Sequence, residues 1–174
     1  MDINPIDTHY NGLLFRSRLE ARWAVFFDAL GIKYRYEPEG YRLPNGMAYL
    51  PDFFLPEING GIFAEVKWKI DDASLEKIAQ LAAWTEKPVA VLENIPNPGD
   101  SADISVYYDE HSMDMGHEFC QCPKCGKTGL QFEARAARNC DCTDNDREYM
   151  GLQPQVEAAY DKVRKARFEY GENG

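Results

Sequence analysis

The segment at residues 62–68, Ile-Phe-Ala-Glu-Val-Lys-Trp, constrains the fold most. Successive side chains of a strand point to opposite faces, so Glu65 and Lys67 would share one face with Phe63. The other face would carry Ile62, Ala64, Val66 and Trp68. The pattern predicts a strand in the middle of a sheet, where two ionisable groups are costly to bury unless the protein uses them.

The first 108 residues predict further strands interrupted by helices. A helix over residues 16–30 is indicated by apolar side chains at helical spacing and by Gly31 as a stop signal. Turn residues and apolar runs predict the other elements: a strand at 33–37, a hairpin over 41–55, a helix at 71–84, and strands at 88–93 and 104–108. This order predicts an α/β (α+β) fold, with a central mixed sheet flanked by helices.

A second acidic residue falls within reach of the charged strand. Asp52 follows Pro51 in the second arm of the predicted hairpin, where a neighbouring strand would place its carboxylate beside Glu65. Two carboxylates suit a hard divalent cation such as Mg²⁺, and a lysine beside them can hold or deprotonate an attacking water. Glu20 borders the apolar stripe of the first helix, and taken alone it is better explained by pairing with Arg16 four residues earlier.

These residues resemble the PD-(D/E)XK nuclease superfamily, which has the restriction-endonuclease-like fold. The resemblance covers residues 14–108 and consists of Glu20 on the first helix, Pro51-Asp52, and Glu65-Val66-Lys67 on the next strand. The opening Phe-Arg-Ser-Arg-Leu-Glu-Ala-Arg-Trp-Ala is also similar to small nucleases of phages and prophages. Gln80 and Trp84 resemble the Gln-x-x-x-Tyr element of the RecB-like branch, with tryptophan in the tyrosine position.

The resemblance implies a metal-dependent deoxyribonuclease that leaves 5′-phosphate and 3′-hydroxyl ends, in phage or prophage DNA processing. Asp52, Glu65 and the backbone carbonyl of Val66 would coordinate Mg²⁺ or Mn²⁺, and Lys67 would orient or deprotonate the water. Burial near the metal is expected to lower the pKa of Lys67. Two further residues receive roles from the resemblance: Glu20 would hold a second metal or its waters, and Gln80 would contact the phosphate or support the metal ligands.

The second half of the chain contains a separate cysteine cluster. Cys122 and Cys125 have the two-residue spacing of a zinc knuckle, and Cys140 and Cys142 would complete a structural Zn²⁺ site. Cys120 is then the spare cysteine, although Cys120 or His117 would also suit one ligand position. The expected organisation is a nuclease core at residues 1–112, a zinc-ribbon module at 113–150, and a C-terminal helix and tail at 151–174, with the helix over 154–170.

The charge balance favours a second function class. The chain carries a net charge of −10, and residues 1–116 hold 10 Lys and Arg against 19 Asp and Glu. Basic stripes near Glu20 and at residues 162–167 would serve DNA contacts or form solvated helix faces. The alternative is therefore a non-catalytic binding protein or inhibitor that keeps the fold and uses its acidic surface to bind a basic protein partner or to mimic DNA. The sequence shows neither a membrane span nor a signal-peptide pattern, and we expect a cytoplasmic location, the host cytoplasm if phage-encoded.

Overall fold

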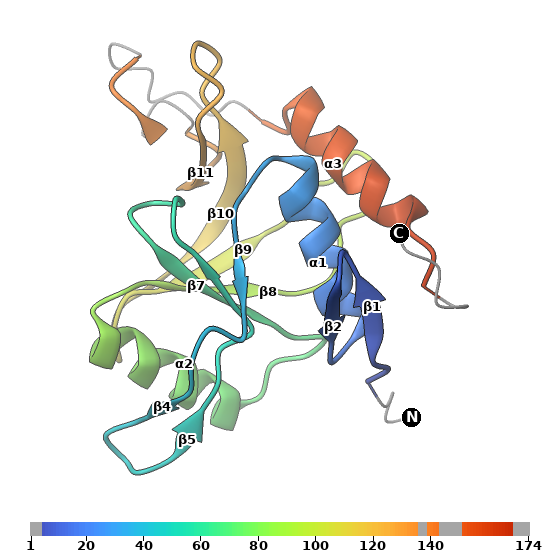
Figure 1. Ribbon diagram of the computed structural model, residues 1–174. Coiled ribbons are helices and arrows are strands. Elements are labelled where there is room, and N and C mark those ends of the chain that lie inside the picture. Colours follow the sequence, from blue (N-terminus) through green and yellow to red (C-terminus); the bar gives the residue numbers. More distant parts are fainter. Residues whose placement is uncertain (1–4, 136–138, 143–150, 169–174) are drawn as a thin grey trace.

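A seven-stranded mixed sheet organises the chain, in the order β11-β10-β9-β8-β7-β6-β3 (Figure 1). In the computed structural model, residues 5–135, 139–142 and 151–168 are described. Strands β7 and β8 are parallel, and the other neighbouring pairs are antiparallel. The strands are β3 (Arg35–Tyr36), β6 (Phe53–Leu55), β7 (Ile62–Val66), β8 (Val89–Leu92), β9 (Ile104–Tyr107), β10 (Met113–Gln121) and β11 (Thr128–Phe132).

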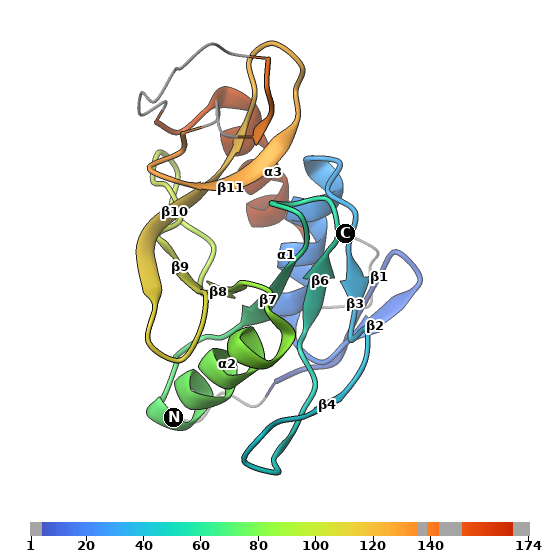
Figure 2. The same ribbon diagram turned by 90° about the vertical axis from the view of Figure 1, so that its left-hand side faces the viewer.

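Helices cover both faces of this sheet (Figures 1 and 2). Helices α1 (Arg18–Ala29) and α3 (Pro154–Lys165) pack together on one face, and α2 (Asp72–Thr85) lies on the other. The alternation of β7 explains the two layers. Ile62, Ala64 and Val66 enter the larger core with α1 and α3, while Phe63 enters the smaller core under α2. The predicted mixed α and β architecture is therefore present.

Helix α1 forms the centre of the larger core. The Ser17 hydroxyl caps its first turn by accepting the Glu20 N–H at 3.1 Å. Trp23, Phe26 and Phe27 are fully buried, and the indole N–H of Trp23 donates to the Glu93 carbonyl at 2.9 Å. Phe26 stacks on Tyr160 of α3 with ring centroids 4.5 Å apart, so the apolar face of α1 joins the sheet to the C-terminal helix.

The edge strand β11 contacts the turn between β6 and β7. Asn59, in the turn between β6 and β7, accepts the Leu130 N–H at 3.2 Å and donates to the Leu130 carbonyl at 2.5 Å. Leu130 belongs to β11, four strands away from β7 in the sheet order. The β6–β7 turn is thus attached to the edge strand at the far end of the sheet.

Several predicted elements differ in detail from the structure. The hairpin expected over residues 41–55 is divided: β4 (Tyr41–Arg42) and β5 (Ala48–Tyr49) form a separate two-stranded sheet, and β6 joins the main sheet. Asp52 therefore lies directly before a strand of the main sheet. A further hairpin, β1 (Thr8–Tyr10) with β2 (Leu13–Phe15), was not predicted, because its strands have only three residues each. Helix α3 ends at Lys165, before the predicted limit, and residues 169 and 170 lie outside the described residues.

The cysteine-rich segment is continuous with the sheet. Strand β10 pairs with β9 over Met113 to His117 and with β11 over His117 to Gln121. The β10–β11 hairpin lies within residues 113–150, for which a zinc-ribbon module was expected, and it forms the end of the seven-stranded sheet. Within the described residues, no helix is long and apolar enough to cross a membrane.

Candidate functional site

Asp52 and Glu65 lie opposite each other at one end of the β6–β7 ladder. Phe53 pairs with Ala64, and the same register continued by one residue places Asp52 across from Glu65. The Val66 N–H donates to Asp52 Oδ2 at 2.8 Å, which fixes the aspartate against the partner strand. Both carboxylates are buried, Asp52 with 5 % and Glu65 with 2 % of its surface exposed. The sheet register therefore brings together the two carboxylates singled out in the sequence.

Lys67 contributes a cation to this carboxylate pair. Its Nζ lies 2.6 Å from Glu65 Oε1, and a third of its side chain remains exposed. Burial alone would lower the pKa of Lys67, but the carboxylates of Glu65, Asp52 and Glu20 outweigh burial and raise it. In the protein without bound metal, the raised pKa keeps Lys67 as an ammonium ion, and the lowering expected near a bound metal stays a prediction.

The surroundings of Asp52 oppose the ionisation of its carboxyl group. Burial, and then the charge of Glu65, raise the pKa of Asp52 to about 8. Burial and Glu65 also raise the pKa of Tyr49, whose hydroxyl lies in the same region. Glu65 Oε2 is buried and has no hydrogen-bond partner among the described residues. An unpartnered carboxylate oxygen beside an aspartate that resists ionisation is the environment that a divalent cation would stabilise.

Glu20 approaches the pair from α1. Its Oε1 accepts the Ser17 hydroxyl at 2.7 Å, and its Oε2 accepts the Tyr36 hydroxyl at 2.6 Å and the Arg16 N–H at 3.2 Å. The ion pair between Glu20 and the Arg16 guanidinium, weighed from the sequence, does not form. That guanidinium instead pairs with Glu37 and lies 3.8 Å from Asp52 Oδ1.

The three carboxylates do not converge on one point as a preformed ligand set. Among the described residues, the only group of three or more His, Cys, Asp or Glu side chains with ligand atoms within 4.8 Å of one another consists of cysteines. Glu20 therefore interacts with Asp52 and Lys67 through its charge, while its oxygens are held by Ser17 and Tyr36.

Gln80 is not joined to the carboxylates. Its Nε2 donates to Glu76 Oε1 on the same helix at 3.1 Å, and within the described part of the chain no hydrogen bond links it to Asp52, Glu65 or Lys67. Trp84, which stands in the tyrosine position of the Gln-x-x-x-Tyr element, is 60 % exposed. The role expected for Gln80 thus has no support in these contacts.

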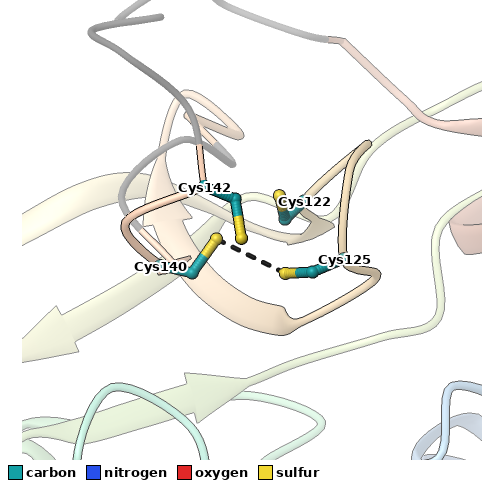
Figure 3. Close-up of side chains that lie close together, drawn as sticks. All are labelled: Cys122, Cys125, Cys140 and Cys142. Carbon is teal, nitrogen blue, oxygen red and sulfur yellow. Dashed lines mark hydrogen bonds between the residues drawn. The ribbon is translucent and has the colours of Figure 1, made fainter.

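Four cysteines form the second site (Figure 3). The sulfur atoms of Cys122, Cys125, Cys140 and Cys142 all lie within 4.8 Å of one another, and the Sγ atoms of Cys125 and Cys140 are 3.5 Å apart. In the knuckle, the Cys125 and Lys124 backbone N–H groups face the Cys122 sulfur, and the Cys125 N–H is the largest cause of a Cys122 pKa lowered to about 7. This arrangement could hold a metal ion such as zinc.

Cys120 and His117 lie apart from this cluster. Cys120 is fully buried, burial raises its pKa to about 12, and Asn139 Nδ2 donates to its carbonyl at 2.9 Å. His117 is paired with the Tyr108 hydroxyl at 3.2 Å. Asn139 also binds the Lys127 carbonyl at 3.1 Å and packs where a Cβ at Gly129 would collide with it, so it docks the Cys140 segment on the β10–β11 hairpin.

Comparison with known proteins does not identify the chain: no protein-family model matches it, and neither the curated proteins nor the solved structures contain a match. The geometry alone therefore carries the functional argument. It adds Tyr36 and Tyr49 to the site, two residues that sequence reasoning did not connect with Glu20, Asp52 or Glu65. It also places the Arg16 guanidinium, which the spacing linked to Glu20, beside Asp52 instead.

Proposed function

We propose that the protein is a metal-dependent deoxyribonuclease of the PD-(D/E)XK type, with the restriction-endonuclease-like fold. The observation that carries the proposal is the cross-strand pair Asp52 and Glu65, with Lys67 bound to Glu65 at the end of the same strand. Burying this set without a ligand is unfavourable, because Asp52 resists ionisation and Glu65 Oε2 lacks a partner among the described residues.

The residues suggest a division of roles in phosphodiester hydrolysis. A Mg²⁺ or Mn²⁺ ion, held by Asp52, Glu65 and the Val66 carbonyl, would neutralise charge that develops on the phosphate. Lys67, as an ammonium ion, would orient the attacking water rather than deprotonate it. Glu20 is held by Ser17 and Tyr36 and adds negative charge to the same region. By resemblance, the products are 5′-phosphate and 3′-hydroxyl ends.

A tetrathiolate Zn²⁺ site would serve structure in this proposal. Four cysteine ligands leave no open position for substrate, so zinc at Cys122, Cys125, Cys140 and Cys142 would join the end of the β10–β11 hairpin to residues 139–142. The catalytic and structural metals would thus occupy separate sites.

The net charge of −10 favours a second candidate function, that of a non-catalytic protein that binds a basic partner. In that case the ion pair of Glu65 with Lys67 and the contact of Asp52 with Arg16 would only compensate buried charge. This alternative predicts that the parent protein does not cleave DNA with any divalent cation.

Cleavage assays separate the two candidates. The purified protein is incubated with circular and linear DNA in the presence of Mg²⁺, Mn²⁺ or EDTA, beside the variants Asp52→Asn and Glu65→Gln. Glu57→Gln is the matched control, because Glu57 is an exposed carboxylate that pairs with Lys33. We expect metal-dependent cleavage by the parent and by the control only. Cleavage by both site variants at the parental rate would refute the assignment.

A further inference from the structure

Trp68 is an exposed tryptophan just beyond the end of β7, the strand that carries Glu65. It follows Lys67 directly, at the end of the segment that carries Glu65, and 67 % of its surface is exposed. Tryptophan is on average highly buried in folded proteins, so the exposed indole of Trp68 leaves a large apolar face available for a ligand. Among the described residues, no ring contact or hydrogen bond engages Trp68.

Cationic side chains lie at the carboxylates and next to Trp68 in the chain. Lys67 keeps a third of its side chain in solvent, and Lys69, one residue beyond Trp68, is exposed. On the Asp52 side, the Arg16 guanidinium lies 3.8 Å from the carboxylate, and 55 % of the Arg16 side chain is exposed. These residues provide local positive charge for a phosphate backbone on a chain that is acidic overall.

We propose that the Trp68 indole stacks on an unpaired base next to the phosphate that enters the carboxylate site, and that the substrate is single-stranded DNA. This inference rests on the proposed nuclease function and specifies its substrate. An exposed aromatic ring between lysines is the combination by which proteins hold single strands, because every base offers a face for stacking. In a duplex, each base face is already stacked on its neighbours, so duplex DNA cannot satisfy Trp68 without being opened.

Binding measured without divalent cations tests the inference independently of cleavage. A fluorescein-labelled oligothymidine and a duplex of the same length are titrated with the parent, Trp68→Ala, Trp68→Phe and Trp84→Ala. Trp84 is the matched control, since it is a second exposed tryptophan, on α2. Loss of one stacked base weakens single-strand affinity by about 5- to 100-fold in Trp68→Ala. Trp68→Phe loses less, and Trp84→Ala binds like the parent.

Tryptophan fluorescence provides a direct signal for stacking. In a Trp84→Phe background, the remaining indoles are Trp68 and the fully buried Trp23. Oligothymidine should quench this variant, and the additional change Trp68→Phe should abolish the quenching. Circular dichroism spectra that match the parent show that each variant is folded.

Three results would overturn the inference: equal single-strand affinity in the parent and Trp68→Ala, an equal loss in Trp84→Ala, or duplex binding as tight as single-strand binding. Failure of the proposed function looks different. If Trp68-dependent binding is present but Mg²⁺ produces no cleavage, the nuclease proposal fails and the stacking inference stands as a binding site.

Discussion

The side-chain amide of Asn59 is hydrogen-bonded to both backbone groups of Leu130. Asn59 lies in the turn of the β6–β7 hairpin, whose other end carries Asp52 and Glu65. Leu130 lies on β11, in the hairpin that also bears Cys122 and Cys125 at its turn. This contact holds the two hairpins together and mimics the pairing of an additional strand on the edge of β11.

Replacing Asn59 by aspartate should therefore destabilise the fold. A carboxylate oxygen would face the Leu130 carbonyl in place of the amide donor, and we expect the free energy of unfolding to fall by about 1–2 kcal/mol. Urea denaturation measures the change. Asn45→Asp is the control, because it adds the same charge in an exposed turn and keeps an acceptor for the Met47 N–H. Equal stability of the two variants would show that the Asn59 contact contributes nothing.

Local patterns in the sequence predicted the elements that carry the site, and tertiary contacts determined its surroundings. The helical spacing of Trp23, Phe26 and Phe27 indicated α1, and the alternation around Glu65 indicated β7. The contacts of Tyr36 with Glu20 and of Arg16 with Asp52 join separate elements whose relative placement no spacing encodes. The cysteines were easier to predict, because a metal site requires short spacings that are visible in the sequence.

The raised pKa of Asp52 predicts how the stability of the protein without added divalent cations depends on pH. The folded-state pKa of about 8 exceeds the ordinary value of 3.8, so between these values the folded state binds more protons than the unfolded state. Stability from Asp52 is therefore fully present below pH 4 and is lost as the pH rises toward 8. Asp52→Asn should remove this part of the slope and unfold less readily than the parent at pH 8.

Urea denaturation of both proteins at intervals from pH 4 to 9 measures the difference in slope. Added Mg²⁺ should restore stability to the parent near pH 8, because the cation favours the ionised carboxylates, and should leave Asp52→Asn nearly unchanged. Parallel stability curves for the two proteins would mean that Asp52 is already ionised in the folded state.

The cysteine cluster predicts about one zinc ion per chain. Cys122→Ser or Cys140→Ser should release the ion and destabilise the end of the β10–β11 hairpin, since binding energy at such a site contributes to folding. Cys120→Ala is the control, because Cys120 lies outside the cluster. Native mass spectrometry counts the metal in each variant. Zinc retained by both serine variants, or absent from a folded parent, would contradict a tetrathiolate site.

The ion pair between Lys67 and Glu65 predicts that Lys67 can be removed without loss of metal affinity. In the protein without metal, Lys67 Nζ lies 2.6 Å from Glu65 Oε1 and competes with a cation for that carboxylate. Lys67→Met should therefore bind Mn²⁺ at least as tightly as the parent, whereas Asp52→Asn should bind it more weakly. If Lys67 orients the attacking water, the same variant should cleave DNA about 100- to 10,000-fold more slowly.

Calorimetric titration with Mn²⁺ and single-turnover cleavage measure the two effects separately. Weaker Mn²⁺ binding by Lys67→Met, matching that of Asp52→Asn, would mean that Lys67 only supports Glu65, and the water would need another orienting group.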